Sequence, residues 1–455
     1  MPSYAEIAAI RLGFGLSPRL TPPADPAGMA ASVAASTRFG PQAVTLDKVR
    51  AWQDKGLDLG AAARAGDPAA RDRDVAYRRR LGGIYRAAIQ NRFARAVDDP
   101  SGFGERLVWF WADHFTVTGG TVYWNLMTDA FVQDAIRPHL TGRFADMMLA
   151  AEIHPAMVRY LDQDRSVGPN SARSRRNPDK PLGLNENLAR EMIELHSLGV
   201  GADYSQQDVT QLAELLTGLA YHPRQTGIFR PGQAEPGVET VLGVRYGGGR
   251  ASLDDIRGVI ADLARHPATA RHIARKMAVH FVADEPPQPL VDRLAAVFAD
   301  TGGDLGAMNL ALVEAPELQQ QFRQKMRQPF DFLVAALRGL GVDGRQVRDM
   351  KPGQLQRLLL QPMTAMGQAW GSPLGPDGWP EDRAAWASPQ GLAMRITWAL
   401  SAPSRLTDPL PDARQLLRAA LGDTASEALS WAVPRAESQA EGVALILASA
   451  DFNRR

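Results

Sequence analysis

Apolar residues recur at intervals of three and four along most of the chain, the spacing that places them on one face of an α-helix. The clearest pattern lies just before the middle of the chain. There Asn185 can cap a helix, and Gly199 can end it in a left-handed backbone conformation. We therefore expect a helix from about Glu186 to Leu198, followed after a glycine-containing loop by a second helix that begins at Ser205.

The first of these helices carries most of its charge opposite its apolar stripe. Each residue turns by 100°, so Asn187, Arg190 and Glu194 share the polar side, while Glu191 and His196 lie at the borders of the stripe. One interpretation is a solvated ladder of i, i+4 ion pairs beside one hydrogen-bonded core histidine. The other is a pocket lined by Arg190, Glu191, Glu194 and His196 with groups from elsewhere. The spacing leaves both open.

Helical periodicity dominates most of the remaining sequence, with one interruption. Between residues 222 and 249 glycine is frequent, and two β-leaning patches, Gly227 to Arg230 and Thr240 to Tyr246, predict a small hairpin. The stretches at 20–40 and 47–66 are rich in Pro, Ala, Ser and polar residues, and we expect them to be irregular or weakly helical. The predicted fold class is mainly α: a multi-helical globular domain with a small β-hairpin insertion.

The length of 455 residues would allow about three domains, but one large helical domain over 1–455 fits the pattern equally well. The alternative is a subdivision into an N-terminal helical part at 1–220 that contains the candidate site, a glycine-rich hairpin insertion at 221–250 and a C-terminal helical part at 251–455.

Composition removes several classes of function. Lys and Arg number 51 against 50 Asp and Glu, so no global field favours nucleic acid or an anionic membrane, and nucleic acid is not an expected partner. The absence of cysteine rules out thiolate metal sites, disulfides and cysteine nucleophiles. No apolar run approaches the roughly 18 residues of a membrane span, and no export signal is visible. We expect a cytoplasmic protein as written, or a periplasmic or extracellular one if the sequence is a mature form.

Two further segments carry candidate chemistry. An aromatic helical segment places Trp111 in line with other aromatic residues and contains His114, either a hydrogen-bonded core histidine or a ligand. Asp162 precedes a long loop that includes Arg173 and Arg176. Such a loop is either a mobile solvated segment or a lid that contacts anions above the central helix.

Several motifs resemble those of a bacterial family called domain of unknown function 1800. NENLAREMIELHSLGV and YSQQDVTQLAELLTG carry the strongest resemblance, and RLGFG, FWADHF, HPAMVRYLD, ARKMAVHFV and ASADFNRR agree with it in order. The resemblance spans nearly the whole chain but implies no established chemistry. Members of that family usually contain a His-Asp pair where this chain reads AEPGVETVLG, which suggests either lost activity or use of Glu235 instead. Many relatives also look exported.

Two functions follow as hypotheses. The favoured one is a binding or assembly protein, with a protein partner, whose motif residues form an internal polar network. The alternative is a metal-dependent hydrolase-like enzyme with a divalent cofactor such as zinc or manganese. The residues expected to act are, for catalysis, Glu191, Glu194, His196 and Arg190; for substrate binding, Trp111, Arg173, Arg176 and Asn187; and for metal binding, His114, Asp162 and Glu191.

Overall fold

The computed structural model describes residues 2–40, 42–179, 182–225 and 227–455. It confirms a mainly helical fold with one two-stranded sheet in these residues. Helices of the first 220 residues are α1 (Tyr4–Arg11), α2 (Pro26–Ser36), α3 (Leu46–Arg64), α4 (Pro68–Asp98), α5 (Phe103–His114), α6 (Val122–Phe131), α7 (Phe144–Glu152), α8 (Pro155–Tyr160), α9 (Ala172–Arg175), α10 (Asn187–Glu194) and α11 (Gln206–Leu215). A π-helical turn at Val132–Ile136 and short 3-10 turns at Arg137–His139 and Gln163–Arg165 connect them.

Helices continue after the hairpin of β1 (Val238–Val241) and β2 (Val244–Gly247). The next group is α12 (Leu253–Arg265), α13 (Pro267–Phe281), α14 (Gln288–Asp300), α15 (Leu305–Val313) and α16 (Glu317–Gln320). The last group is α17 (Pro329–Gly339), α18 (Gly344–Arg348), α19 (Pro352–Leu355), a π turn at Gln356–Leu360, α20 (Gln361–Ala365), α21 (Arg383–Trp386), α22 (Pro389–Ser401), α23 (Pro403–Leu406), α24 (Ala413–Leu421), 3-10 turns at Gly422–Thr424 and Val433–Arg435, α25 (Glu427–Ala432), α26 (Gln439–Ala448) and α27 (Ala450–Asn453).

The hairpin is displaced from the two predicted patches. β1 and β2 pair antiparallel, with Val238 opposite Gly247, and the tight turn at Leu242 and Gly243 falls inside the second patch. Both turn residues have positive φ, the conformation that matches the twist of a two-residue hairpin loop. The first patch contributes only an isolated bridge between Leu219 and Phe229. The second patch therefore supplies most of the hairpin, because Leu242 and Gly243 at its centre form the turn.

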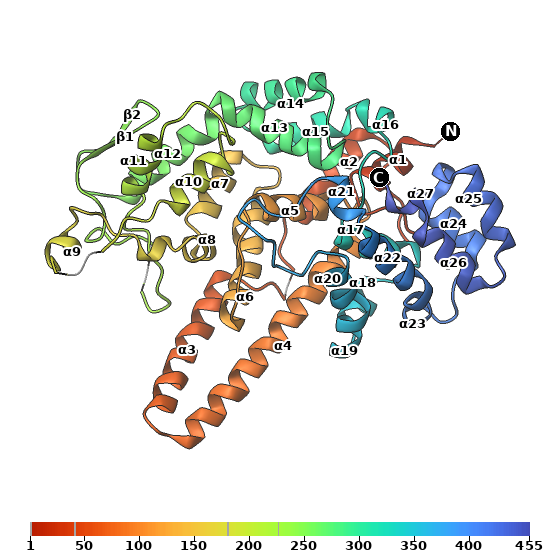
Figure 1. The fold of residues 1–455 in the computed structure, drawn as a ribbon, viewed down its shortest axis with the longest axis horizontal. Coiled ribbons are helices and arrows are strands. Elements are labelled where there is room, and N and C mark those ends of the chain that lie inside the picture. The colour runs from red at the N-terminus through yellow and green to blue at the C-terminus, as the bar shows by residue number, and fades with distance from the viewer. Residues whose placement is uncertain (1, 41, 180–181, 226) are drawn as a thin grey trace.

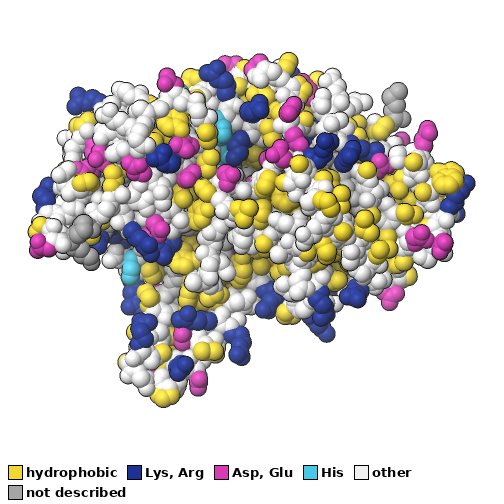
Figure 2. Space-filling view, viewed as in Figure 1, with side chains coloured by type: hydrophobic (Ala, Val, Ile, Leu, Met, Phe, Trp, Pro, Cys, Tyr) yellow, Lys and Arg dark blue, Asp and Glu magenta, His cyan; other side chains and the backbone are white. Residues whose placement is uncertain are grey.

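The two stretches expected to be irregular form regular helices instead. Pro26 at the first turn and Asp25 as N-cap begin α2, and α3 packs along α4 to form a long hairpin. Figure 1 shows this α3–α4 hairpin projecting from the rest of the molecule, and Figure 2 shows basic side chains along it. Packing against α4 therefore supplies the order that the weak apolar pattern of residues 47–66 did not predict.

Buried hydrophobic side chains form two main clusters. The first draws on α1 to α8 and α10 to α16, and the second on α4, α17 to α20, α22 and α24 to α27. α5 contributes to both, with Trp111 in the first cluster and Trp109 in the second. Within the described residues, no helix is both long enough and apolar enough to cross a bilayer.

Ion pairs with buried members join the two clusters. Arg106 on α5 contacts Asp331 on α17 at 3.3 Å, and Arg455 contacts the same carboxylate at 3.5 Å. His280 on α13 lies 2.5 Å from a carboxylate oxygen of Glu381, which also pairs with Lys325. These ion-paired residues form what we call the polar seam between the clusters. Its members are Arg106, His280, Lys325, Asp331, Glu381 and Arg455.

Candidate functional site

The central helix α10 has the polar ladder that its spacing predicts. Arg190 lies 3.2 Å from Glu186 and 3.3 Å from Glu194, and all three side chains are partly exposed. The helix is shorter than expected, since it begins at Asn187 and ends at Glu194. Gly199, with φ of 95°, takes the left-handed conformation expected of it, but the chain leaves helical geometry before reaching it.

His196 follows α10 and points into the core. Its Nδ1 lies 2.7 Å from Glu152 Oε1 on α7, and both side chains are fully buried. The backbone carbonyl of His196 accepts from Nε2 of His114, and His272 Nε2 donates in the same way to the carbonyl of Leu195. Burial lowers the pKa of His114 well below its ordinary value, with Lys276 and the nearby histidines acting in the same direction. The structure therefore brings His114 and His196 together in the core.

Glu191 lies on the same helix in a half-buried position. Burial raises the pKa of its carboxyl group, His196 lowers it, and Glu194 and Asp377 raise it further. Asp377 belongs to the loop between α20 and α21, so this loop reaches toward α10. Glu191 and His196 are consequently electrostatic neighbours.

The remaining predicted residues lie apart from this cluster. Asp162 is about half exposed and pairs with Arg159 and Arg165, both at 3.3 Å. Arg173 and Arg176 are exposed on and after the short helix α9, and Asn187 is exposed on α10. Trp111 is fully buried in the first hydrophobic cluster rather than at a pocket wall. Throughout the described ranges, no group of three or more His, Asp or Glu side chains is placed to hold a metal ion.

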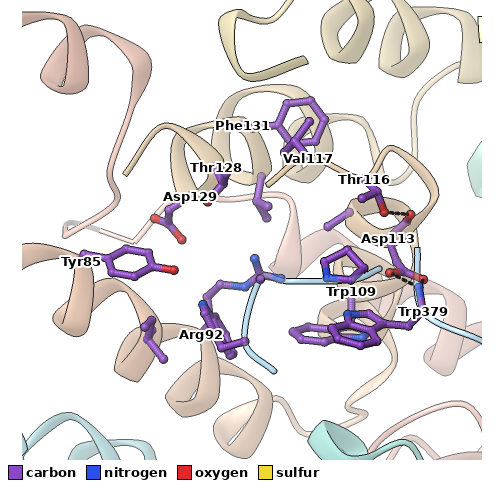
Figure 3. A pocket seen from close by; sticks show the side chains of 16 residues that line it. Tyr85, Arg92, Trp109, Asp113, Thr116, Val117, Thr128, Asp129, Phe131 and Trp379 are labelled. Carbon is purple, nitrogen blue, oxygen red and sulfur yellow. Dashed lines mark hydrogen bonds between the residues drawn. The ribbon is translucent and has the colours of Figure 1, made fainter. Parts of the chain in front are cut away.

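A different pocket lies where the two hydrophobic clusters meet, and Figure 3 shows it. The pocket opens to solvent and has a cavity volume of about 80 Å³. Its walls come from α4, α5, α6, the π turn after α6 and the loops after α5 and α20. The lining residues are Tyr85, Ile89, Arg92, Trp109, Ala112, Asp113, Thr116, Val117, Thr128, Asp129, Phe131, Val132, Trp370, Gly371, Pro373 and Trp379.

Aromatic rings form one side of this pocket. Trp109 stacks on Phe330 with ring centroids 4.0 Å apart and planes within 2° of parallel. The guanidinium of Arg92 lies over Trp109 at 5.3 Å and over Trp370 at 5.6 Å. A cation held over aromatic faces retains its N–H donors at the edge of the guanidinium plane. Arg92 is thus positioned by stacking while its hydrogen-bonding edge stays free for another group.

Arg92 and Asp129 are oppositely charged groups of one pocket that do not pair with each other. Among the described residues, neither side chain forms a hydrogen bond or an ion pair, although Asp129 is only 7% exposed. Burial raises the pKa of Asp129 to about 6, and the positive charges of Arg92 and Arg137 oppose that rise. In Figure 3 the Asp129 carboxylate, the Tyr85 hydroxyl and the Arg92 guanidinium extend into the same space.

Asp113 forms the opposite wall of the pocket. Its carboxylate accepts the backbone N–H of Trp379 at 3.0 Å, and this contact attaches the loop before α21 to α5. Burial raises the pKa of Asp113 to about 8, with Glu381 adding to the rise. Lys276, half-buried on α13, has its pKa lowered by burial and raised by Asp113. Burial and the neighbouring carboxylate thus favour the protonated form of Asp113.

The residues that line this pocket were largely missed by sequence reasoning. Arg92 lay in a basic helix whose arginines are mostly solvated, and Asp129 lay in an amphipathic helix without a motif. A usable signal was present at Asp113, which adjoins His114 in FWADHF. Trp370 and Trp379 flank a loop rich in glycine and proline, and such loops often carry function.

A family model described as "Protein of unknown function (DUF1800)" matches residues 7–454. The chain belongs to the DUF1800 family. No curated protein and no solved structure matches it.

The DUF1800 motifs contribute residues both to the pocket and to the buried groups around His196. FWADHF supplies Asp113 to the pocket and His114 to the buried cluster, while ARKMAVHFV supplies His280 to the polar seam. Glu235, at the place of the expected His-Asp pair, accepts from the backbone N–H and the side chain of Asn170. In this DUF1800 protein Glu235 thus attaches the 168–175 segment to the region before the hairpin.

Proposed function

We propose that this DUF1800 protein is a binding protein that takes a small organic molecule into the tryptophan-lined pocket. The observation that carries the proposal is the pair Arg92 and Asp129, opposite charges that line one pocket and form no hydrogen bond or ion pair among the described residues, although Asp129 is only 7% exposed. A buried charge without a counter-group costs several kcal/mol. Such groups persist when they serve a ligand, and a largely apolar pocket with a few convergent polar groups is the usual form of a ligand site.

The polar groups around α10 have a different role in this proposal. The contact between Glu152 and His196 and the pairs that Asp331 and Glu381 make form an internal network that fixes how the helices pack. Buried networks specify one arrangement when their members are paired. Glu191, Glu194, Arg190 and Asn187 then belong to the surface of this network. Metal-dependent hydrolysis, the alternative function, gains no support from the geometry, because no three ligand groups converge among the described residues.

The test is a ligand screen with matched variants. A library of small metabolites is scanned by thermal shift and by the fluorescence of the pocket tryptophans, using the wild type, Arg92→Gln and Asp129→Asn. Arg78→Gln serves as control, because Arg78 lies on the same helix α4 but is exposed and pairs with Asp74. We expect at least one saturable ligand whose affinity falls about tenfold or more in both pocket variants and is unchanged in the control. Ligands that bind all four proteins equally, or no ligand at all, would overturn the proposal.

A further inference from the structure

The unpaired charges also restrict what kind of molecule the pocket accepts, and this step rests on the proposed binding function. Arg92 offers several N–H donors in a planar fork, which matches the two oxygens of a carboxylate. Asp129 offers carboxylate oxygens only, which match a cationic or neutral donor such as an ammonium group. A ligand that satisfies both side chains must carry an acceptor anion and a donor cation close together.

Other ligand charges fit less well. A simple anion would satisfy Arg92 but would be repelled by Asp129, and a simple cation would satisfy Asp129 but would be repelled by Arg92. A neutral polyol could hydrogen-bond to both, yet it would bring no opposite charge into contact with either side chain. A zwitterion compensates the two charges at once and leaves the net charge of the pocket unchanged.

The remaining lining residues indicate which side chain the ligand carries in addition to its two charged groups. Apart from the charged groups, the wall is mostly apolar or aromatic. Its apolar and aromatic members are Ile89, Trp109, Ala112, Val117, Phe131, Val132, Pro373, Trp370 and Trp379. A polar side chain on the ligand would lose its hydration against these groups, whereas an apolar one would gain about 25 cal/mol for each Å² removed from water.

We propose that the pocket binds a free α-amino acid with an apolar side chain, its carboxylate on Arg92 and its ammonium group on Asp129. An α-amino acid has both charges on one carbon, so one small molecule reaches both side chains in the common space of Figure 3. The polar part of the wall is completed by Tyr85, Asp113, Thr116 and Thr128.

The experiment is a cycle of ligand analogues against variants, measured by isothermal titration calorimetry on the full chain. The probes are L-leucine and L-phenylalanine, their methyl esters, which lack the carboxylate charge, and 4-methylpentanoate and 3-phenylpropanoate, which lack the amine. The proteins are the wild type, Arg92→Gln, Asp129→Asn and the exposed control Arg78→Gln. Circular dichroism and melting temperature verify that each variant is folded.

We expect at least one amino acid to bind the wild type, with Kd raised about 10-fold to 100-fold for either analogue. Arg92→Gln should weaken the amino acid but not its ester, and Asp129→Asn should weaken the amino acid but not the desamino acid. Equal losses for all ligands in both variants would overturn the zwitterion assignment. If amino acids fail while another molecule from the screen binds in an Arg92-dependent manner, the ligand class is wrong and the binding function stands. If nothing binds the wild type, both fall.

Discussion

Glu152 and His196 lie on different helical segments, yet their side chains meet at 2.7 Å in the core, with exposures of 0% and 1%. The contact ties α7 to the turn after α10, and the carbonyl of His196 in turn accepts from His114. His196, which lies in a family motif, thus connects the turn after α10 with α7 and α5. Its contacts favour a structural role for this part of the motif.

Removing Glu152 should therefore destabilise the protein. We expect Glu152→Ala to lower the free energy of unfolding by about 2–4 kcal/mol, because it leaves His196 buried without its partner. Urea denaturation followed by circular dichroism measures the change. Arg190→Ala is the matched comparison from the partly exposed ladder, where the loss should stay below about 1 kcal/mol. Similar losses in both variants would contradict the structural role of the buried pair.

The seam between the clusters should be more sensitive still. Asp331 is 1% exposed and faces Arg106 and Arg455, so Asp331→Asn removes the charged carboxylate that both buried guanidinium groups contact. We expect a loss of about 3–5 kcal/mol, measured by equilibrium denaturation. Asp349→Asn removes a carboxylate from a pair with Arg345 whose side chains are 86% and 70% exposed, and it should be nearly neutral. If both variants have the same free energy of unfolding as the wild type, the polar seam does not stabilise the contact between the clusters.

Asp129 should give the pocket a measurable pH signature in the absence of ligand. Its pKa rises from 3.8 to about 6 on folding, so the folded state binds a proton more tightly than the unfolded state. The ionised carboxylate therefore costs stability above pH 6, and this cost disappears as the pH falls through the window from about 6 to 3.8. The charged groups that act on it are Arg92 and Arg137, which lower its pKa, and Asp134, which raises it.

Asp129→Asn should consequently stabilise the protein at pH 7.5 by up to about 3 kcal/mol. The difference from the wild type should shrink toward pH 4, where the wild-type carboxyl is largely protonated. Unfolding curves at a series of pH values test this sign. A stability gap that widens as the pH falls would mean that the carboxylate is compensated within the folded protein.

Gly13 of the RLGFG motif has no room for a side chain. A methyl group on Gly13 would overlap the backbone carbonyl of Ser101, whereas one on Gly82 in α4 would meet nothing within 4 Å. We expect Gly13→Ala to cost about 2 kcal/mol or more, and Gly82→Ala to add about 0.5–1 kcal/mol through helix propensity. Melting temperatures of the two variants distinguish these outcomes. A neutral Gly13→Ala would show that the first loop can move away from Ser101.

The sequence predicted the parts of the fold that local rules decide. Helical periodicity gave the fold class, the cap at Ser205 was confirmed as a capping box with Asp208, and the ladder on Arg190 was confirmed. The helix α3 was missed because its apolar pattern is weak and it owes its order to packing on α4. Stabilisation by packing against a distant helix cannot be recognised in a short window of sequence.

The candidate pocket could not be predicted for a similar reason. Arg92, Asp129 and Trp370 lie on α4, on α6 and beyond α20, and no spacing rule connects them. What distinguishes Arg92 from the solvated arginines of the same helix is the pair of indole rings beneath it, and one of these comes from the far end of the chain. Glu191 and His196 belong to one short segment, but the helical pattern placed them on the two borders of the apolar stripe, so the influence of His196 on the Glu191 carboxyl was not predicted.

The polar seam has a consequence for biosynthesis. Arg106 leaves the ribosome long before Asp331, and His280 before Glu381, so the emerging chain has no counter-charges for these groups. Apolar helices of the first cluster can collapse during translation, but closing their final contact would bury a guanidinium without compensation. We therefore expect the nascent N-terminal part to keep its apolar surface exposed until the later helices arrive.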